Sequence, residues 1–215
     1  FVGLLRTMED DCGDGLWSKE LGDSRYAFMI LDAMGHGPAA AIALGEFVHV
    51  IEELPLLDLQ ATIAVVNARY MALPHFVTGE TPFVTGLLLV VDESSGTLEA
   101  ICFGHPGLIF TPTGCHEIPG GAPVGLIEGC DVWPVRRLLL RALGSRILAY
   151  TDGVIEQFNA RGSMYGMDNL AQNFASTSWL PLTTSLETIL HNMDRWRGGA
   201  ALMDDQGLLG IEFHG

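Results

Sequence analysis

The sequence has few basic residues for its size. Its 215 residues include 11 Lys and Arg against 26 Asp and Glu, which gives a formal net charge of -15. Proteins that hold nucleic acid bind its phosphate backbone with Lys and Arg, so this balance argues against a nucleic-acid partner. The acidic excess leaves carboxylates available to bind cations. Whether some of them gather in one place is therefore the first question about function.

Cysteines are also few. There is no CxxC pair and no His at a spacing typical of zinc sites, and four cysteines are too few for a disulfide scaffold in a chain this long. The four are Cys12, Cys102, Cys115 and Cys130. We expect them to be free thiols in a reducing, cytoplasmic location, with Cys12 a small buried residue rather than a nucleophile.

Long apolar runs are missing as well. No run reaches the ~18 residues that a transmembrane helix needs, so we expect no membrane span. A composition of 48% hydrophobic and 17% charged residues favours one globular domain over residues 1–215, with a sizeable core. The sequence begins with Phe1 rather than Met and shows no signal peptide, from which we expect a domain of a longer chain.

Two segments near the start predict a β-hairpin that pairs two aspartates. Residues 25–31 form an apolar run that ends at Asp32, and a turn at residues 21–24 separates it from residues 13–19. In a hairpin centred on Asp23, residues whose numbers sum to 46 lie opposite each other, so Asp14 faces Asp32. Cβ atoms of such neighbours are ~5 Å apart, where two carboxylates repel unless a cation lies between them or one is protonated.

The remaining pattern alternates helices with β-hairpins. A stripe at helical spacing predicts a helix from Pro38, and Asp58 is expected to cap a second helix. Further strands are expected at 86–92, 97–103, 147–151 and 208–213, and weaker helices at 167–175 and 184–195. This order predicts an antiparallel α+β layered fold.

Acidic residues stand at several strand ends. Asp32 and Asp152 each follow a hydrophobic strand, and Asp204 and Asp205 come just before the last one. Because neighbouring antiparallel strands begin and end side by side, these carboxylates can meet on one rim of a sheet. Aspartate at a strand end is also a common turn former or helix cap. A cluster of carboxylates without Cys or His is the ligand set of Mg²⁺ or Mn²⁺.

Five short motifs occur in order along the chain. They are Asp32-Ala33-Met34-Gly35-His36-Gly37, Gly104-His105-Pro106, Ala122-Pro123-Val124-Gly125, Tyr150-Thr151-Asp152-Gly153 and Asp204-Asp205. With these motifs the chain resembles the SpoIIE/RsbU/RsbX branch of the PPM (PP2C-like) metal-dependent serine/threonine phosphatases, from about Cys12 to its end. The resemblance implies a PP2C-like layered β-sandwich of two antiparallel sheets flanked by helices.

The resemblance also implies a site for two Mn²⁺ or Mg²⁺ ions. It makes Asp32 the bridging ligand that positions the nucleophilic water, and the backbone carbonyl of Ala33 a ligand of one metal. Asp14 matches the aspartate of the family's first strand. Asp152 and Asp204 are expected to complete the shell of the second metal.

The sequence departs from the family pattern in three places. Ala33 stands where the family usually has Gly, and Gly207 stands where the final motif usually has Thr. The basic residue that grips phosphate in eukaryotic members has no counterpart near Asp14. His36 is a candidate general acid, although the comparable His of eukaryotic members lies at the position of Met34, and a role in the loop or helix start is the alternative.

The function that the resemblance implies is hydrolysis of phosphoserine or phosphothreonine by a water that the two metals activate. The implied substrate is a phosphorylated STAS-domain protein, such as an anti-anti-sigma regulator, in bacterial stress or sporulation signalling. An upstream sensor or regulatory domain is expected to control the enzyme through the helix near the bridging ligand. Two alternatives remain: a catalytically degenerate module that binds a partner, and a hydrolase of small phosphate metabolites.

Overall fold

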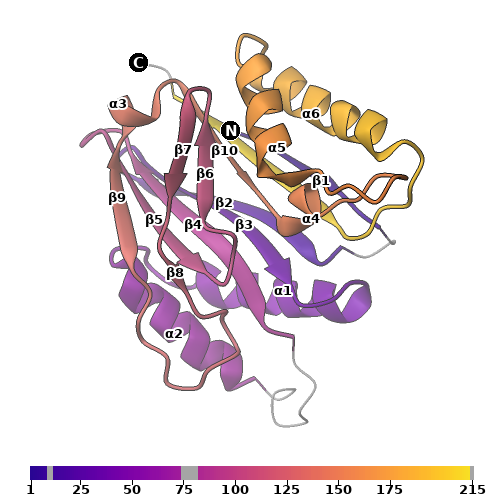
Figure 1. The fold of residues 1–215 in the computed structure, drawn as a ribbon. Helices are drawn as coiled ribbons and strands as arrows, with labels where there is room; N and C mark the ends of the chain where they lie inside the picture. The colour runs from indigo at the N-terminus through magenta and orange to yellow at the C-terminus, as the bar shows by residue number, and fades with distance from the viewer. Residues whose placement is uncertain (9–11, 74–81, 214–215) are drawn as a thin grey trace.

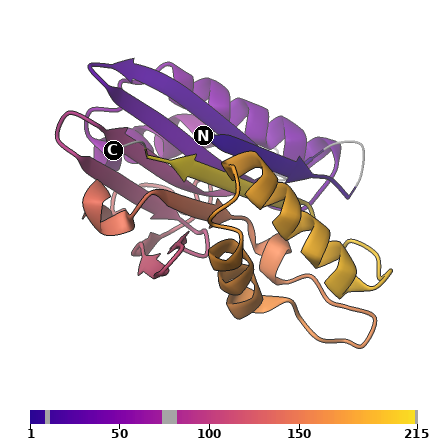
Figure 2. The same cartoon turned by 90° about the horizontal axis from the view of Figure 1, so that it is seen from above.

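The computed structural model describes residues 1–8, 12–73 and 82–213. Two β-sheets face each other, and helices cover both outer faces (Figures 1 and 2). One sheet has the strand order β1-β11-β10-β6-β7 and the other β2-β3-β4-β5-β8, with β9 also paired to β5. The expected layered sandwich is confirmed.

The strands of the two sheets alternate along the chain. They are β1 (Val2–Arg6), β2 (Asp14–Gly22), β3 (Arg25–Ala33), β4 (Val84–Asp92), β5 (Thr97–Phe103), β6 (Leu108–Thr111), β7 (Gly114–Glu117), β8 (Gly120–Gly121), β9 (Val135–Leu139), β10 (Arg146–Tyr150) and β11 (Gln206–Glu212). The helices are α1 (Pro38–Glu52), α2 (Leu59–Met71), α3 (Leu140–Leu143), α4 (Asp152–Ile155), α5 (Gly166–Ser176) and α6 (Leu182–Arg197). All named strand pairs are antiparallel except β5 with β8, whose short contact is parallel.

The β2–β3 hairpin has the predicted register. Asp14 pairs with Asp32, and the sum of 46 holds from there to Glu20 and Tyr26, beyond which a bulge shifts the pairing. The turn residues Asp23 and Ser24 both have positive φ, which short polar residues tolerate better than branched ones. The hairpin therefore brings two carboxylates together at the end of a central strand.

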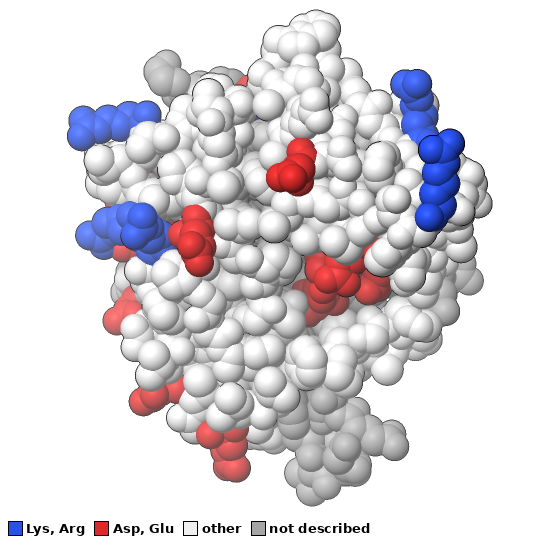
Figure 3. Space-filling model, in the orientation of Figure 1, with Lys and Arg blue, Asp and Glu red and all other residues white. Residues whose placement is uncertain are grey.

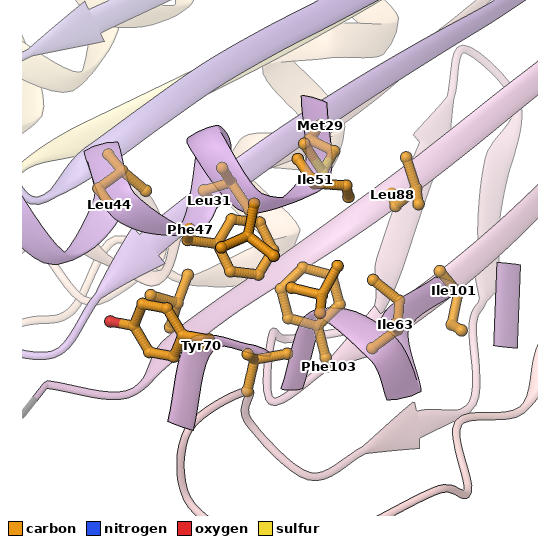
Figure 4. Close-up of a cluster of buried hydrophobic side chains, with 14 of the residues drawn as sticks. Met29, Leu31, Leu44, Phe47, Ile51, Ile63, Tyr70, Leu88, Ile101 and Phe103 are labelled. Carbon is orange, nitrogen blue, oxygen red and sulfur yellow. The ribbon is translucent and has the colours of Figure 1, made fainter. Parts of the chain in front are cut away.

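Helices α1 and α2 cover the outer face of the six-stranded sheet. Pro38 occupies the first turn of α1, and the Asp58 carboxylate accepts a hydrogen bond from the Ala61 N–H to cap α2, both as predicted. Phe47 of α1 stacks on Phe103 of β5, with ring centroids 5.6 Å apart (Figure 4). These apolar contacts fix α1, and with it the loop that connects α1 to Asp32.

Two further apolar layers complete the sandwich. Side chains of both sheets, among them Ile30 and Ile147, fill the space between them. On the other side α5 and α6 pack against the five-stranded sheet through Phe174 and Ile189. Helices α5 and α6 and strand β11 lie within two residues of their predicted bounds. None of the helices in the described part of the chain has the length and hydropathy of a membrane span.

Candidate active site

The Asp14–Asp32 pair lies at one end of the sandwich. Asp14 opens β2 and is only 5% exposed, and Asp32 stands one residue before the end of β3. The Ala33 N–H donates to the Gly13 carbonyl at 2.9 Å, which holds the two strand ends together. The side chains of this pair therefore start from adjacent positions on rigid strands.

Asp152 and Asp204 lie in segments that adjoin strands β10 and β11 of the other sheet. Asp152 is the first residue of α4, directly after β10, and Asp204 lies two residues before β11. Gly153 allows the two segments to meet, because a Cβ there would lie 2.0 Å from the Asp205 carbonyl oxygen. The Gln206 side chain also donates to the Gly153 carbonyl at 3.1 Å.

The acidic residues thus gather between two sheets. The expectation of one rim of a single sheet is wrong, because β2 and β3 belong to the six-stranded sheet while β10 and β11 belong to the five-stranded one. In the space-filling view acidic side chains lie in a recess between the part with α4 to α6 and the part with α1 and α2 (Figure 3). Lys and Arg side chains in that view lie at the margins of the face.

Burial and mutual repulsion disfavour ionisation of the pair. Burial, with the charges of Asp32 and Asp205, raises the pKa of Asp14 to about 8, against a hydrogen bond from Thr151. Burial, with the charges of Asp152 and Asp204, raises the pKa of Asp32 to about 7. The four aspartates therefore lie within electrostatic range of one another, and a cation among them would relieve this cost.

Burial is also the first cause that raises the pKa of Asp204, followed by the nearby charges of Asp152 and Asp205. The Asp205 N–H donates to the Asp204 carboxylate at 2.9 Å and opposes that shift.

Asp205 has a different use. Its carboxylate accepts hydrogen bonds from the backbone N–H groups of Met8 and Gly13, each at 2.7 Å, and it is 3% exposed. These bonds tie the segment before Asp14 to the start of β11. Asp205 therefore holds the backbone next to Asp14 in place, a role that the Asp-Asp sequence alone does not reveal.

Two threonines that the sequence analysis did not single out bond to the pair. The Thr151 hydroxyl donates to Asp14 Oδ2 at 2.6 Å. The Thr85 hydroxyl lies 3.2 Å from the Asp32 carbonyl oxygen and 3.3 Å from Asp32 Oδ2, so its proton is shared between these two acceptors. Thr85 is the cross-strand partner of Asp32 on β4. The Thr in the motif before Asp152 was the one signal that could have indicated the first contact.

The donor set suits a hard divalent cation. As the side chains stand, no three His, Cys, Asp or Glu residues in the described ranges converge closely enough to hold a metal ion. Carboxylate and carbonyl oxygens with excess negative charge and raised pKa values are nevertheless the ligands that Mg²⁺ and Mn²⁺ take. The chemistry of these residues therefore fits such ions.

Ala33 fits its position without disturbing the backbone. Its side chain is fully buried in the core beneath α1. Its carbonyl oxygen lies close to Gly13, where an added Cβ would come within 3.3 Å of it and within 2.9 Å of the Gly35 carbonyl. The Ala that replaces the family's usual Gly thus keeps its carbonyl beside the Asp14–Asp32 pair.

The other candidate residues have simpler surroundings. His36 is exposed and near enough to lower the pKa of Asp204 slightly, after the larger effects of burial and neighbouring carboxylates. Burial raises the pKa of the Cys12 thiol to about 12, which makes it a poor nucleophile at neutral pH. His105 is buried, and burial lowers its pKa to about 4.

Solved structures with the same fold define the class of protein. The SiaA-PP2C domain of Pseudomonas aeruginosa is similar with a TM-score of 0.83 and 19% identity, over 99% of this chain and 85% of that one. The RsbU and RsbW domains of a Mycobacterium tuberculosis protein give 0.76 and 21%, over 98% and 59%. The PP2C phosphatase domain and regulatory fragment of SpoIIE from Bacillus subtilis give 0.78 and 18%, over 98% and 62%. The fold is that of a PP2C-like phosphatase domain.

The family follows from the sequence match. The model of stage II sporulation protein E (SpoIIE) matches residues 22–214, and the chain belongs to the SpoIIE family. No curated protein sequence matches it. The family match begins after Asp14, so the argument for that residue rests on its pairing with Asp32.

Proposed function

We propose that this domain is a metal-dependent phosphoprotein phosphatase that hydrolyses phosphoserine or phosphothreonine. The observation that carries the proposal is the pairing of the buried Asp14 with the partly buried Asp32, within electrostatic range of Asp152 and Asp204, in a domain of the SpoIIE family. Like charges placed this close on rigid strands are costly unless a cation joins them. The family itself supports a phosphatase function and the use of divalent metals.

Each residue has a defined role in this proposal. Two Mn²⁺ or Mg²⁺ ions would be held by these residues, with Asp32 as the shared ligand, Asp14 and the Ala33 carbonyl as ligands of one ion, and Asp152 and Asp204 as ligands of the other. When bound, such ions lower the pKa of a water molecule and neutralise charge on phosphoryl oxygens. The chain's own contribution is to fix the carboxylates at the ends of β2 and β3 and to bring α4 and β11 against them.

The degenerate-module alternative rests on Ala33 and Gly207. Ala33 is accommodated in the core with its carbonyl beside Gly13, and the Gly207 N–H takes part in the contacts around Asp14. All four proposed carboxylates are present. These observations favour a competent enzyme over a binding module.

A phosphorylated STAS-domain protein is the proposed substrate. The similar Mycobacterium tuberculosis chain combines an RsbU and an RsbW domain, which supports a place in a regulatory system with protein partners. An upstream sensor or regulatory domain and a role in stress signalling are parts of the same proposal. A hydrolase of small phosphate metabolites would need basic groups for the free phosphate, whereas Lys and Arg lie at the margins of the face in Figure 3.

The test measures phosphate release from a phosphorylated STAS-domain protein and from small phosphate esters. We expect turnover of the phosphoprotein with Mn²⁺ or Mg²⁺, none in chelator, and recovery when metal is restored, because oxygen ligands bind these ions with modest affinity. Full turnover by protein shown to be metal-free would reject the metal-dependent mechanism. Binding of the partner without turnover, at any metal concentration, would favour the degenerate module.

A further inference from the structure

A buried threonine joins the two halves of the acidic site. Thr151 stands between β10 and α4 and is 0% exposed, while Asp14 belongs to the opposite sheet. The Thr151 hydroxyl donates to Asp14 Oδ2 at 2.6 Å, a distance typical of a hydroxyl bound to a carboxylate. This bond joins residues 137 positions apart in the chain.

The backbone of Gly207 fixes the direction of this hydrogen bond. The Gly207 N–H donates to Thr151 Oγ1 at 2.7 Å, and the Thr151 N–H donates to the Gly207 carbonyl at 3.1 Å. A hydroxyl has a single proton. Because Oγ1 accepts from Gly207, its proton is directed to Asp14.

Thr151 gives up a usual role to make this contact. It is the N-cap residue of α4, a position where threonine side chains commonly accept from the helix's first N–H groups. Here the side chain makes no capping hydrogen bond. Its hydroxyl is thus committed to Asp14 rather than to the helix that it precedes.

Gly207 leaves room for this arrangement. A Cβ at position 207 would lie 3.2 Å from Thr151 Cγ2, 3.3 Å from Thr151 Oγ1 and 3.4 Å from Asp14 Oδ2. A side chain there would crowd Thr151 and come into contact with Asp14 Oδ2. The departure from the family's usual Thr therefore matches the close packing around Thr151.

We propose that Thr151 is a positioning residue, directed by the Gly207 N–H, that holds Asp14 Oδ2 and so orients the carboxylate for a divalent cation. The proposal rests on the proposed function for the identity of that cation. Thr151 bonds to one of the two carboxylate oxygens of Asp14, and the other oxygen, Oδ1, would be available to the metal. Thr85 has the corresponding, longer contact with Asp32.

The test compares Thr151→Val, which keeps the shape and removes the hydroxyl, with Thr151→Ser, which keeps the hydroxyl. The control is Thr177→Val, because Thr177 is another buried threonine, and it is bonded to Ser185 and Asn173, neither of which is a proposed metal ligand. Mn²⁺ affinity of each folded protein is measured by calorimetry. We expect about a tenfold or greater loss for Thr151→Val and a change under about threefold for Thr151→Ser and Thr177→Val.

A second variant and a second measurement keep the outcome decisive. If Thr151→Val does not fold, Gly207→Ala is titrated instead, and it should also weaken Mn²⁺ binding, since its Cβ would crowd the Thr151 side chain that holds Asp14 Oδ2. Amide hydrogen exchange at Gly207, measured without metal, should accelerate in Thr151→Val and stay unchanged in Thr151→Ser. Wild-type affinity in Thr151→Val, or in Gly207→Ala where Thr151→Val does not fold, would overturn the proposal. A wild type that binds no Mn²⁺ would instead reject the proposed function, and unchanged Gly207 exchange in Thr151→Val would then overturn the positioning role too.

Discussion

The two halves of the acidic site are built differently. Asp14 and Asp32 lie on paired strands, are largely buried and receive hydroxyl hydrogen bonds, whereas Asp152 begins a short helix and Asp204 is exposed before β11. The strand pair is rigid and electrostatically unfavourable without a cation. The charges of the helix and loop residues add to that cost, since Asp152 and Asp204 raise the pKa of Asp32. The difference indicates that the strand half bears the larger cost of burial, whereas the helix-and-loop half, with the exposed Asp204, contributes mainly through repulsion.

Removing one carboxylate from each half tests this difference most strongly. We expect Asp32→Asn and Asp152→Asn each to reduce phosphatase activity at least about a hundredfold, because both are proposed metal ligands. In chelator at pH 8 Asp32→Asn should stabilise the fold by about 2 kcal/mol, because it removes a largely buried charge, and Asp152→Asn should stabilise it less, because it removes only the repulsion on Asp32. Urea unfolding of the metal-free proteins measures this.

The opposite result has a clear meaning. If Asp152→Asn stabilises the metal-free protein as much as Asp32→Asn does, the two halves carry the repulsion equally and the comparison fails. If Asp32→Asn unfolds or retains wild-type turnover, Asp32 is a structural residue.

The pH dependence of metal-free stability should have the same origin. The folded-state pKa values of Asp14 and Asp32, about 8 and 7, lie above the ordinary value of 3.8. Between these limits the folded state binds more protons than the unfolded state, so the stability that these two groups contribute is fully present below about pH 4 and is lost as pH rises from there through 7 and 8. We expect a loss of about 3 kcal/mol from pH 5 to pH 9 in chelator.

Two comparisons isolate that effect. Asp32→Asn should flatten the pH profile, and saturating Mn²⁺ should flatten it more, because a cation replaces the protons. Burial of His105, whose pKa is lowered to about 4, acts the other way and removes stability as pH falls below about 6.5. A wild-type profile in chelator that is equally steep in Asp32→Asn would refute the assignment to the pair.

The contact that brings the halves together is expected to be intolerant of a methyl group. Gly153→Ala places a Cβ 2.0 Å from the Asp205 carbonyl oxygen, so the start of α4 must move. We expect a loss of about 2 kcal/mol in stability and of about tenfold in Mn²⁺ affinity. Gly120→Ala is the control, since its Cβ would meet nothing within 4 Å. Wild-type stability and affinity in Gly153→Ala would show that the approach of α4 to β11 is unimportant.

The sequence predicted the first half of the site better than the second. An apolar run and a turn are local features, and they were enough to pair Asp14 with Asp32. The meeting of Asp152 with Asp204 depends on sheet order, which brings β10 beside β11 and both against the other sheet. Nothing local specifies that order, so the residues were expected on one rim of one sheet.

Contacts between residues far apart in the sequence explain why the roles of Asp205 and Thr151 were not predicted. Asp205 accepts two backbone N–H groups from the segment before β2, and Thr151 bonds across the sheets. The hydrogen bonds of both residues join positions more than 130 apart in the chain, and neither an Asp nor a Thr in the sequence indicates such a distant partner. The four-residue helix α4 and the short strands β6 to β8 are likewise set by tertiary packing rather than by a periodic pattern.

The smallest expected effect concerns His36, which lies near Asp204 in the helix-and-loop half of the site. A general acid would be worth about a hundredfold to ten-thousandfold in rate, and its loss would remove the decline of activity at alkaline pH. His36 is exposed on the loop before α1, and its recorded influence is a modest one on Asp204. We therefore expect His36→Gln to lower kcat less than about fivefold, with an unchanged pH profile. His49→Gln is the matched control, because His49 is exposed on α1 beside Glu53. A hundredfold loss of kcat in His36→Gln but not in His49→Gln, together with loss of the decline of activity at alkaline pH, would make His36 the proton donor. The half of the site with Asp152 and Asp204 would then have a chemical role as well as a binding one.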